Sequence, residues 1–142
     1  MAVTLLVGHS PRQPPAVTGM LVPMPVVDIA DETYVACPPA ALIAAVADPS
    51  SWAQWWPDLD VRVTRDRGVK GVQWSVGGAL AGSMEIWLEP VAGGTVVHWY
   101  LRVDPARPMR PRRLRRARER RILSWKADMY ALKDRLERAE SH

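Results

Sequence analysis

Residue types that build disulfides, metal sites and membrane spans are scarce in this chain of 142 residues. Its one cysteine, Cys37, excludes an internal disulfide and fits a reducing cytoplasm. No apolar run approaches the roughly 18 residues that a membrane-spanning helix needs. The three histidines have no metal-ligand spacing and no CxxC motif occurs, so we expect neither a metal nor another cofactor.

Cys37 lies at the end of a predicted strand, with no histidine motif beside it. A thiol in such a place is more often a small buried apolar side chain than a nucleophile. We therefore expect Cys37 to be buried.

Charge is distributed unevenly along the chain, whose formal net charge is +4. From Arg107 to Arg138 there are 13 basic and 4 acidic residues, which give +9. The remainder has 6 basic and 11 acidic residues, which give −5. A mildly acidic body thus carries a strongly basic C-terminal segment.

The length and the apolar content of 48% are typical of one domain with a substantial core. Residues 1–27 contain five prolines and little periodicity, which predicts a disordered N-terminal tail before a single domain over residues 28–139. An alternative is that translation starts at Met20 or Met24 rather than at Met1.

The first folded segment predicts a strand followed by two short helices. Residues 28–37 alternate as a strand does, and two prolines then end the ladder because proline has no N–H. Residues 40–47 are helical by propensity, and an Asp-Pro pair interrupts them. Ser50 or Ser51 is suited to cap a second helix that runs through Trp55.

The remaining pattern predicts antiparallel strands and then a long helix. Apolar residues alternate within residues 59–64, 72–76, 84–89 and 95–103. Gly93-Gly94 is a hairpin signal, and short turns imply antiparallel neighbours. Residues 112–139 carry an apolar stripe at helical spacing, which begins only at Ile122.

Several short stretches carry a resemblance to a known superfamily. They are VACPP at 35–39, VAD at 46–48, WAQW at 52–55, and the pair of segments 82–90 and 94–97. In this order, over residues 28–139, the chain resembles the START-like (SRPBCC) helix-grip superfamily. It is similar to the branch of polyketide cyclases/dehydrases and lipid-transport proteins, including actinobacterial members.

The resemblance implies an α+β fold, in which a curved antiparallel sheet grips the long C-terminal helix and two short helices follow the first strand. It also implies a cavity between sheet and helix, suited to an apolar or aromatic molecule such as a lipid or a polyketide. Strand alternation, the helix stripe and the additional ring after the second short helix supply its expected ligand-binding residues: Trp56, Trp74, Val76, Met84, Ile86, Leu88, Val97, Trp99, Leu101, Trp125, Met129 and Leu132.

The three tryptophans of residues 52–56 have different expected places. Trp52 and Trp55 match recurrent aromatic positions of the superfamily, so we expect them to be structural. Trp56 is an additional ring, and we expect it nearer the mouth of the cavity. Between Trp56 and Trp74 there is room for one strand and a turn, where other members usually fit another hairpin. A smaller sheet with several tryptophans also allows a filled, ligand-free core.

Catalysis has less support from the sequence. Cyclases of this superfamily steer an enolate with polar pocket residues, and no such motif can be carried over here position by position. The polar candidates Glu85, His98, Tyr100 and Arg102 alternate onto the face opposite the expected cavity. His98 suits proton transfer near neutrality but is expected on the outer face. Glu85 and Glu89 share a face, where we expect solvated charges.

The basic segment is densest from Arg107 to Arg121, with nine arginines and one acidic residue, Glu119. Helix stability does not explain it, because cations oppose the macrodipole at a helix N-terminus and repel one another. Contact with an anionic membrane or an acidic ligand is one interpretation, and a solvated basic face is another. Nucleic acid is disfavoured, since no aromatic residue interleaves the arginines. The candidate contacts are Arg110, Arg112, Arg113, Arg115, Arg116 and Arg118.

The leading functional prediction is a noncatalytic binder or carrier of an apolar small molecule. The protein would be cytoplasmic, with peripheral attachment to a membrane as an additional option. A cyclase- or aromatase-type enzyme is the alternative, and a basic docking module with a filled core is the third. The ligand and the oligomeric state stay open.

Overall fold

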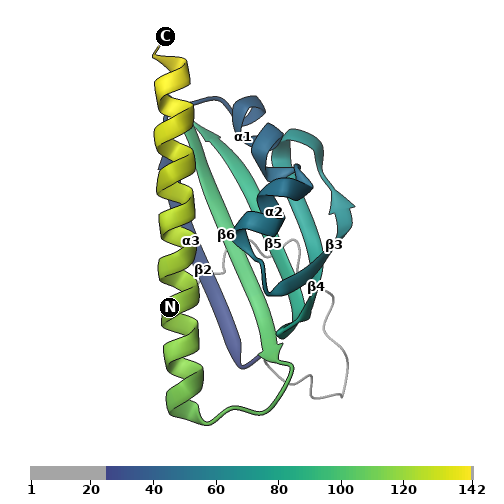
Figure 1. Cartoon of the computed structure of the whole chain (residues 1–142). Coiled ribbons are helices and arrows are strands. Elements are labelled where there is room, and N and C mark those ends of the chain that lie inside the picture. Colours follow the sequence, from purple (N-terminus) through teal and green to yellow (C-terminus); the bar gives the residue numbers. More distant parts are fainter. Residues whose placement is uncertain (1–24, 142) are drawn as a thin grey trace.

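The computed structural model describes residues 25–141, which form one antiparallel sheet, two short helices and a long helix (Figure 1). The expected tail lies outside the described residues up to position 24. In chain order the elements are β2 (Val27–Val35), α1 (Pro39–Val46), α2 (Pro49–Trp55), β3 (Leu59–Asp66), a 3-10 turn (Gly68–Lys70), β4 (Gly71–Gly78), β5 (Leu80–Val91), β6 (Gly94–Pro105) and α3 (Pro111–Glu140).

The sheet has five strands in the order β2-β6-β5-β4-β3, and every neighbouring pair is antiparallel. Three of the pairs are hairpins of consecutive strands, whereas β2 pairs with the last strand, β6. In Figure 1, α3 lies along β2 and β6, and α1 and α2 lie over β5 and β4. The predicted fold class, a sheet that grips the C-terminal helix, is confirmed.

Proline starts each helix, where its missing N–H breaks no hydrogen bond. The cap of α2 differs from our expectation. Asp48 is the cap, and its side chain accepts a hydrogen bond from the backbone N–H of Ser50 at 2.9 Å. The serines expected to cap the helix lie inside it, because Pro49 takes the first helical position.

The first strand begins and ends earlier than predicted. Val27, which we assigned to the tail, is buried and pairs with Val103, because β6 is long enough to offer it a partner. The strand ends at Val35, before Cys37.

The outer face of the sheet, away from the helices, carries the polar candidates. His98 stacks on Trp87 with ring centroids 4.4 Å apart, and its Nε2 lies 2.9 Å from Oε1 of Glu89. Glu85 is not the solvated charge that we expected. It is buried, and its Oε2 accepts a hydrogen bond from Nη1 of Arg67 at 3.2 Å. The arginine approaches from the end of β3, so the ion pair depends on a contact between strands.

Candidate functional site

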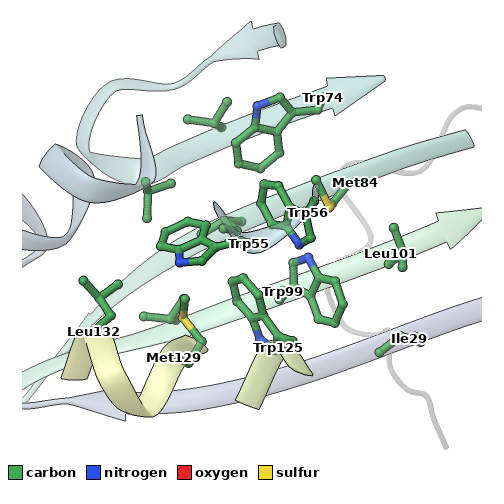
Figure 2. Packing of buried hydrophobic residues seen from close by; sticks show 14 of the residues in the cluster. Ile29, Trp55, Trp56, Trp74, Met84, Trp99, Leu101, Trp125, Met129 and Leu132 are labelled. Carbon is green, nitrogen blue, oxygen red and sulfur yellow. The ribbon is translucent and has the colours of Figure 1, made fainter. Parts of the chain in front are cut away.

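The twelve expected ligand-binding residues come together in the interior between the sheet and the helices (Figure 2). All are buried, and the most exposed of them, Val76, retains 6% of its surface. The sheet supplies its inward rows from β4, β5 and β6, and α3 supplies Trp125, Met129 and Leu132. Apolar residues repeat about every 2 positions in the strands and about every 3.6 positions in the helix, and these two repeats identified the side chains that meet in one shared interior.

Tryptophan rings form a continuous series of contacts through this interior. Trp52 meets Trp74 edge to face at 5.5 Å between centroids, and Trp74 meets Trp56 at 5.3 Å. Trp56 stacks on Trp125 at 5.8 Å, and Trp125 stacks on Trp99 at 4.6 Å. Contacts of this kind contribute about 0.5–1.5 kcal/mol each beyond burial of apolar area.

Trp56 does not lie at a cavity mouth, as we had expected. It is only 2% exposed and contacts Trp55, Trp74 and Trp125. The reason is the end of α2 immediately before it, which turns the ring inward against α3.

Trp52 and Trp55 have the structural places that the resemblance implied. The indole Nε1 of Trp52 donates to the backbone oxygen of Val46 at 2.7 Å, which ties α2 to α1. Trp55 is buried and meets Trp125 edge to face at 5.7 Å.

Three indole N–H groups in this interior have no hydrogen-bond partner among the described residues. They belong to Trp56, Trp74 and Trp99, and all three nitrogens are inaccessible to solvent. In Figure 2 the nitrogens of Trp56 and Trp99 point toward one another, while that of Trp74 points away from both. A buried donor without an acceptor costs about 1–3 kcal/mol. These three donors are the unusual chemical feature of the core.

An ion pair that we did not anticipate attaches α3 to β2 near the point where α3 first becomes buried. Oδ2 of Asp31 accepts a hydrogen bond from Nε1 of Trp125 at 3.2 Å and lies 3.1 Å from Nζ of Lys126. Lys126 also donates to the oxygen of Glu32 and to Oγ1 of Thr33. Asp31 could have been found from the sequence, because it shares the inward row with Thr33 and Val35.

A second attachment joins the C-terminal part of α3 to the end of β2. Lys133 donates to the oxygen of Tyr34 at 2.8 Å and to Oε2 of Glu137 at 2.7 Å. The same carboxylate accepts the N–H of Ala36 at 2.8 Å. Hydrogen bonds from Lys133 and then from Ala36 lower the pKa of Glu137.

Cys37 is free and buried, as expected from its place after the strand. Burial raises the pKa of its thiol, and the nearby carboxylates of Glu140 and Glu137 raise it further. Its backbone oxygen accepts a hydrogen bond from Oγ1 of Thr95 at 2.8 Å.

The candidate arginines for an anionic surface divide into two groups. Arg110, Arg112, Arg113, Arg115 and Arg116 are exposed at the start of α3. Arg118 is also exposed, but it reaches toward the sheet, with Nη2 3.5 Å from the backbone oxygen of Asp28.

Arg121, just beyond the candidates, holds the loop between α2 and β3. Its two terminal nitrogens donate to the two carboxylate oxygens of Asp58 at 2.9 and 2.6 Å. Hydrogen bonds from Arg121 lower the pKa of Asp58, against a smaller effect of burial.

Two further findings concern residues 25–141 as a whole. Within them no group of three or more His, Cys, Asp or Glu side chains could hold a metal ion. None of the helices in that range is long and apolar enough to cross a membrane.

Comparison with known proteins gives structural but no sequence matches. No protein-family model and no curated protein matches the chain. The crystal structure of DR_A0006 from Deinococcus radiodurans is similar, with a TM-score of 0.59, 17% identity, and coverage of 80% of this chain and 98% of that chain. The solution structure of the Aha1 dimer from Colwellia psychrerythraea has a TM-score of 0.57 and 18% identity, and the match covers 79% of this chain and 97% of that chain. The crystal structure of CV1439 from Chromobacterium violaceum has a TM-score of 0.53 and 18% identity, and the match covers 81% of this chain and 99% of that chain.

These similarities, at identities below one fifth, show a shared fold. A sheet of five antiparallel strands, two short helices after the first strand and a long C-terminal helix make up that fold. The chain thus has the helix-grip fold that the resemblance implied.

Proposed function

We propose that this protein binds an apolar or aromatic small molecule, such as a lipid or polyketide-like compound, in the interior between the sheet and α3. The observation that supports this proposal is the set of three unpartnered indole N–H groups, from Trp56, Trp74 and Trp99. Apolar side chains surround them, so the interior combines an apolar lining with a few oriented donors. That combination is typical of small-molecule sites.

The donors define one feature of the ligand. It carries a hydrogen-bond acceptor, such as a carbonyl, ester or carboxylate oxygen, on an apolar body. An acceptor that reaches the N–H groups of Trp56 and Trp99 would satisfy both donors. Each bond to a neutral acceptor is worth about 0.5–1.5 kcal/mol.

Entry of a ligand requires movement of rings, and α2 is the element suited to move. It has only seven residues and ends at Trp55, directly before Trp56. A shift of α2 would withdraw Trp52, Trp55 and Trp56 from the core while leaving the attachments of α3 to β2 in place.

A cyclase-type reaction has weaker support. The inward polar side chains Asp31 and Thr33 are hydrogen-bonded to Trp125 and Lys126 of α3, which gives them a structural role. We therefore propose binding or carriage rather than turnover.

A pair of probes that differ in one acceptor tests the proposal. We expect 2-acetylnaphthalene to quench tryptophan fluorescence at about fivefold lower concentration than 2-ethylnaphthalene, which corresponds to about one hydrogen bond. Trp99→Phe should reduce this preference. Trp52→Phe is the matched control, because the N–H of Trp52 already donates to Val46.

Equal affinity for the two probes, or no binding of either, would contradict the proposal and favour a filled core. Native mass spectrometry of protein purified from its own host would add the mass of any resident ligand. Circular dichroism of each variant would show that a lost preference does not reflect unfolding.

A further inference from the structure

The side of α3 that faces away from the sheet carries a row of residues that the interior site does not involve. Residues three or four apart lie on one side of an α-helix. One such row runs opposite the buried side chains of α3. It consists of Arg112, Arg116, Arg120, Leu123, Ala127 and Tyr130, which we call the outward row.

All members of the outward row are exposed. Leu123 retains 69% of its surface and Tyr130 retains 58%, so both are among the most exposed large apolar side chains of the described residues. In Figure 1 the sheet and the other helices lie to one side of α3, so the exposed residues opposite its buried side chains face away from them. The row is thus basic in its first half and apolar in its second half.

The three arginines of the row have no ion pair with any of residues 25–141. Glu119 is the only acidic residue in the first three turns of the helix, and it too has no ion pair there. Arg110, the N-cap residue of α3, makes no side-chain capping hydrogen bond, and the first turn of the helix contains no acidic residue. The positive end of the helix dipole therefore adds to the arginine charge, which destabilises the helix on its own.

We propose that the outward row of α3 docks on the surface of an anionic membrane. The arginines would contact lipid phosphates, while Leu123 and Tyr130 would enter the boundary between headgroups and acyl chains. Helices that bind at this interface lie in its plane. A helix with a basic part and with exposed leucine and tyrosine side chains is suited to that position. Exposed apolar side chains next to the arginines favour a membrane over nucleic acid, because contacts with phosphates alone would leave Leu123 and Tyr130 in water.

Vesicle flotation with the full-length protein tests the charge part of the proposal. We expect binding to phosphatidylcholine vesicles that contain phosphatidylglycerol, weaker binding at raised salt, and little binding to phosphatidylcholine alone. Arg112→Gln/Arg116→Gln/Arg120→Gln should lower the partition coefficient about a hundredfold, or about fivefold per arginine.

The matched control removes the same charge from the opposite edge of the sheet. Arg62, Arg65 and Lys70 are exposed on or after the edge strand β3. Changing all three to glutamine should leave vesicle binding within about twofold, if position rather than net charge matters. Equal losses in the two triple variants would overturn the proposal.

The apolar part of the row separates membrane from nucleic acid. Leu123→Ser/Tyr130→Ser should weaken vesicle binding by about tenfold, because the buried apolar area in the interface falls. Binding to a DNA duplex that exceeds vesicle binding, and that this double variant leaves unchanged, would also overturn the proposal. Both helix variants change exposed side chains, and thermal unfolding would verify their folding. The probe-binding experiment is independent, so either proposal can fail alone.

Discussion

At the scale of single residues, the indole N–H separates the tryptophans of this protein by role. The chain has seven tryptophans and no phenylalanine, so every large apolar ring also brings a polar atom. Trp52 and Trp125 use that atom to join elements, through Val46 and Asp31. Trp56, Trp74 and Trp99 bury it without a partner among the described residues.

Cys37 supports a prediction at the same scale. Because the thiol is buried and its pKa is raised, little thiolate is present or accessible at pH 8. We expect its reaction with an aromatic disulfide reagent to be about a hundredfold slower in the native protein than in denaturant, since reaction requires local opening. A native rate equal to that of an unfolded thiol would show that Cys37 is not buried.

At the scale of elements, α3 is held by polar contacts at three levels as well as by its apolar stripe. Arg121 binds Asp58 in the loop before β3. Lys126 binds Asp31 within β2, and Lys133 binds the backbone of Tyr34 near the end of β2. The sequence has only three lysines, and two of them make these attachments. A lysine has three donors, which lets Lys126 reach two backbone or side-chain oxygens and a carboxylate at once.

The Arg121–Asp58 pair predicts an acid dependence of stability. The folded pKa of Asp58 is lowered, so its contribution is present above the unfolded value of about 3.9 and is lost as pH falls through the folded pKa. Asp58→Asn should therefore lower the melting temperature at neutral pH, by an effect of about 0.5–1 kcal/mol for a partly exposed pair. The difference from wild type should shrink below about pH 4.

Asp60→Asn is the control for that measurement. Asp60 is more exposed, and its contact with Arg62 is longer, at 3.6 Å. We expect its substitution to change the melting temperature little at any pH. A similar pH-dependent loss in both variants would point to net charge rather than to the specific pair.

At the scale of the whole molecule, the boundary of the domain remains a prediction. We propose that the chain from Met24 onward folds by itself, because the described residues contain a five-stranded sheet and a shared apolar core. Its melting temperature should lie within about 4 °C of that of the full chain, which corresponds to less than about 1 kcal/mol. Scanning calorimetry of the two chains measures this.

A chain that starts at Ala30 serves as the comparison. It lacks Val27 and Ile29, which are buried and pair with β6. We expect this shorter chain to lose several kcal/mol, since two core side chains are removed. If the Met24 chain were equally destabilised, residues before position 24 would belong to the folded domain.

Periodicity alone located most of the fold and the inward rows. The strand alternation of Val97, Trp99 and Leu101, and the helical spacing of Trp125, Met129 and Leu132, are local properties, and the structure places all six in the core. Local signals also gave the correct face for His98. They failed for Glu85, which is buried and accepts a hydrogen bond from Arg67, a residue just beyond the end of β3.

What the sequence by itself determined was therefore the order of elements and which side of each faces inward, because those depend on neighbours along the chain. Only the tertiary structure decided that Trp56 is buried, that Arg118 turns toward β2, and that three indole donors lack partners. Each of these depends on contacts between segments far apart in sequence. Burial, pairing and unmet hydrogen bonds are properties of such contacts, and no local pattern encodes them.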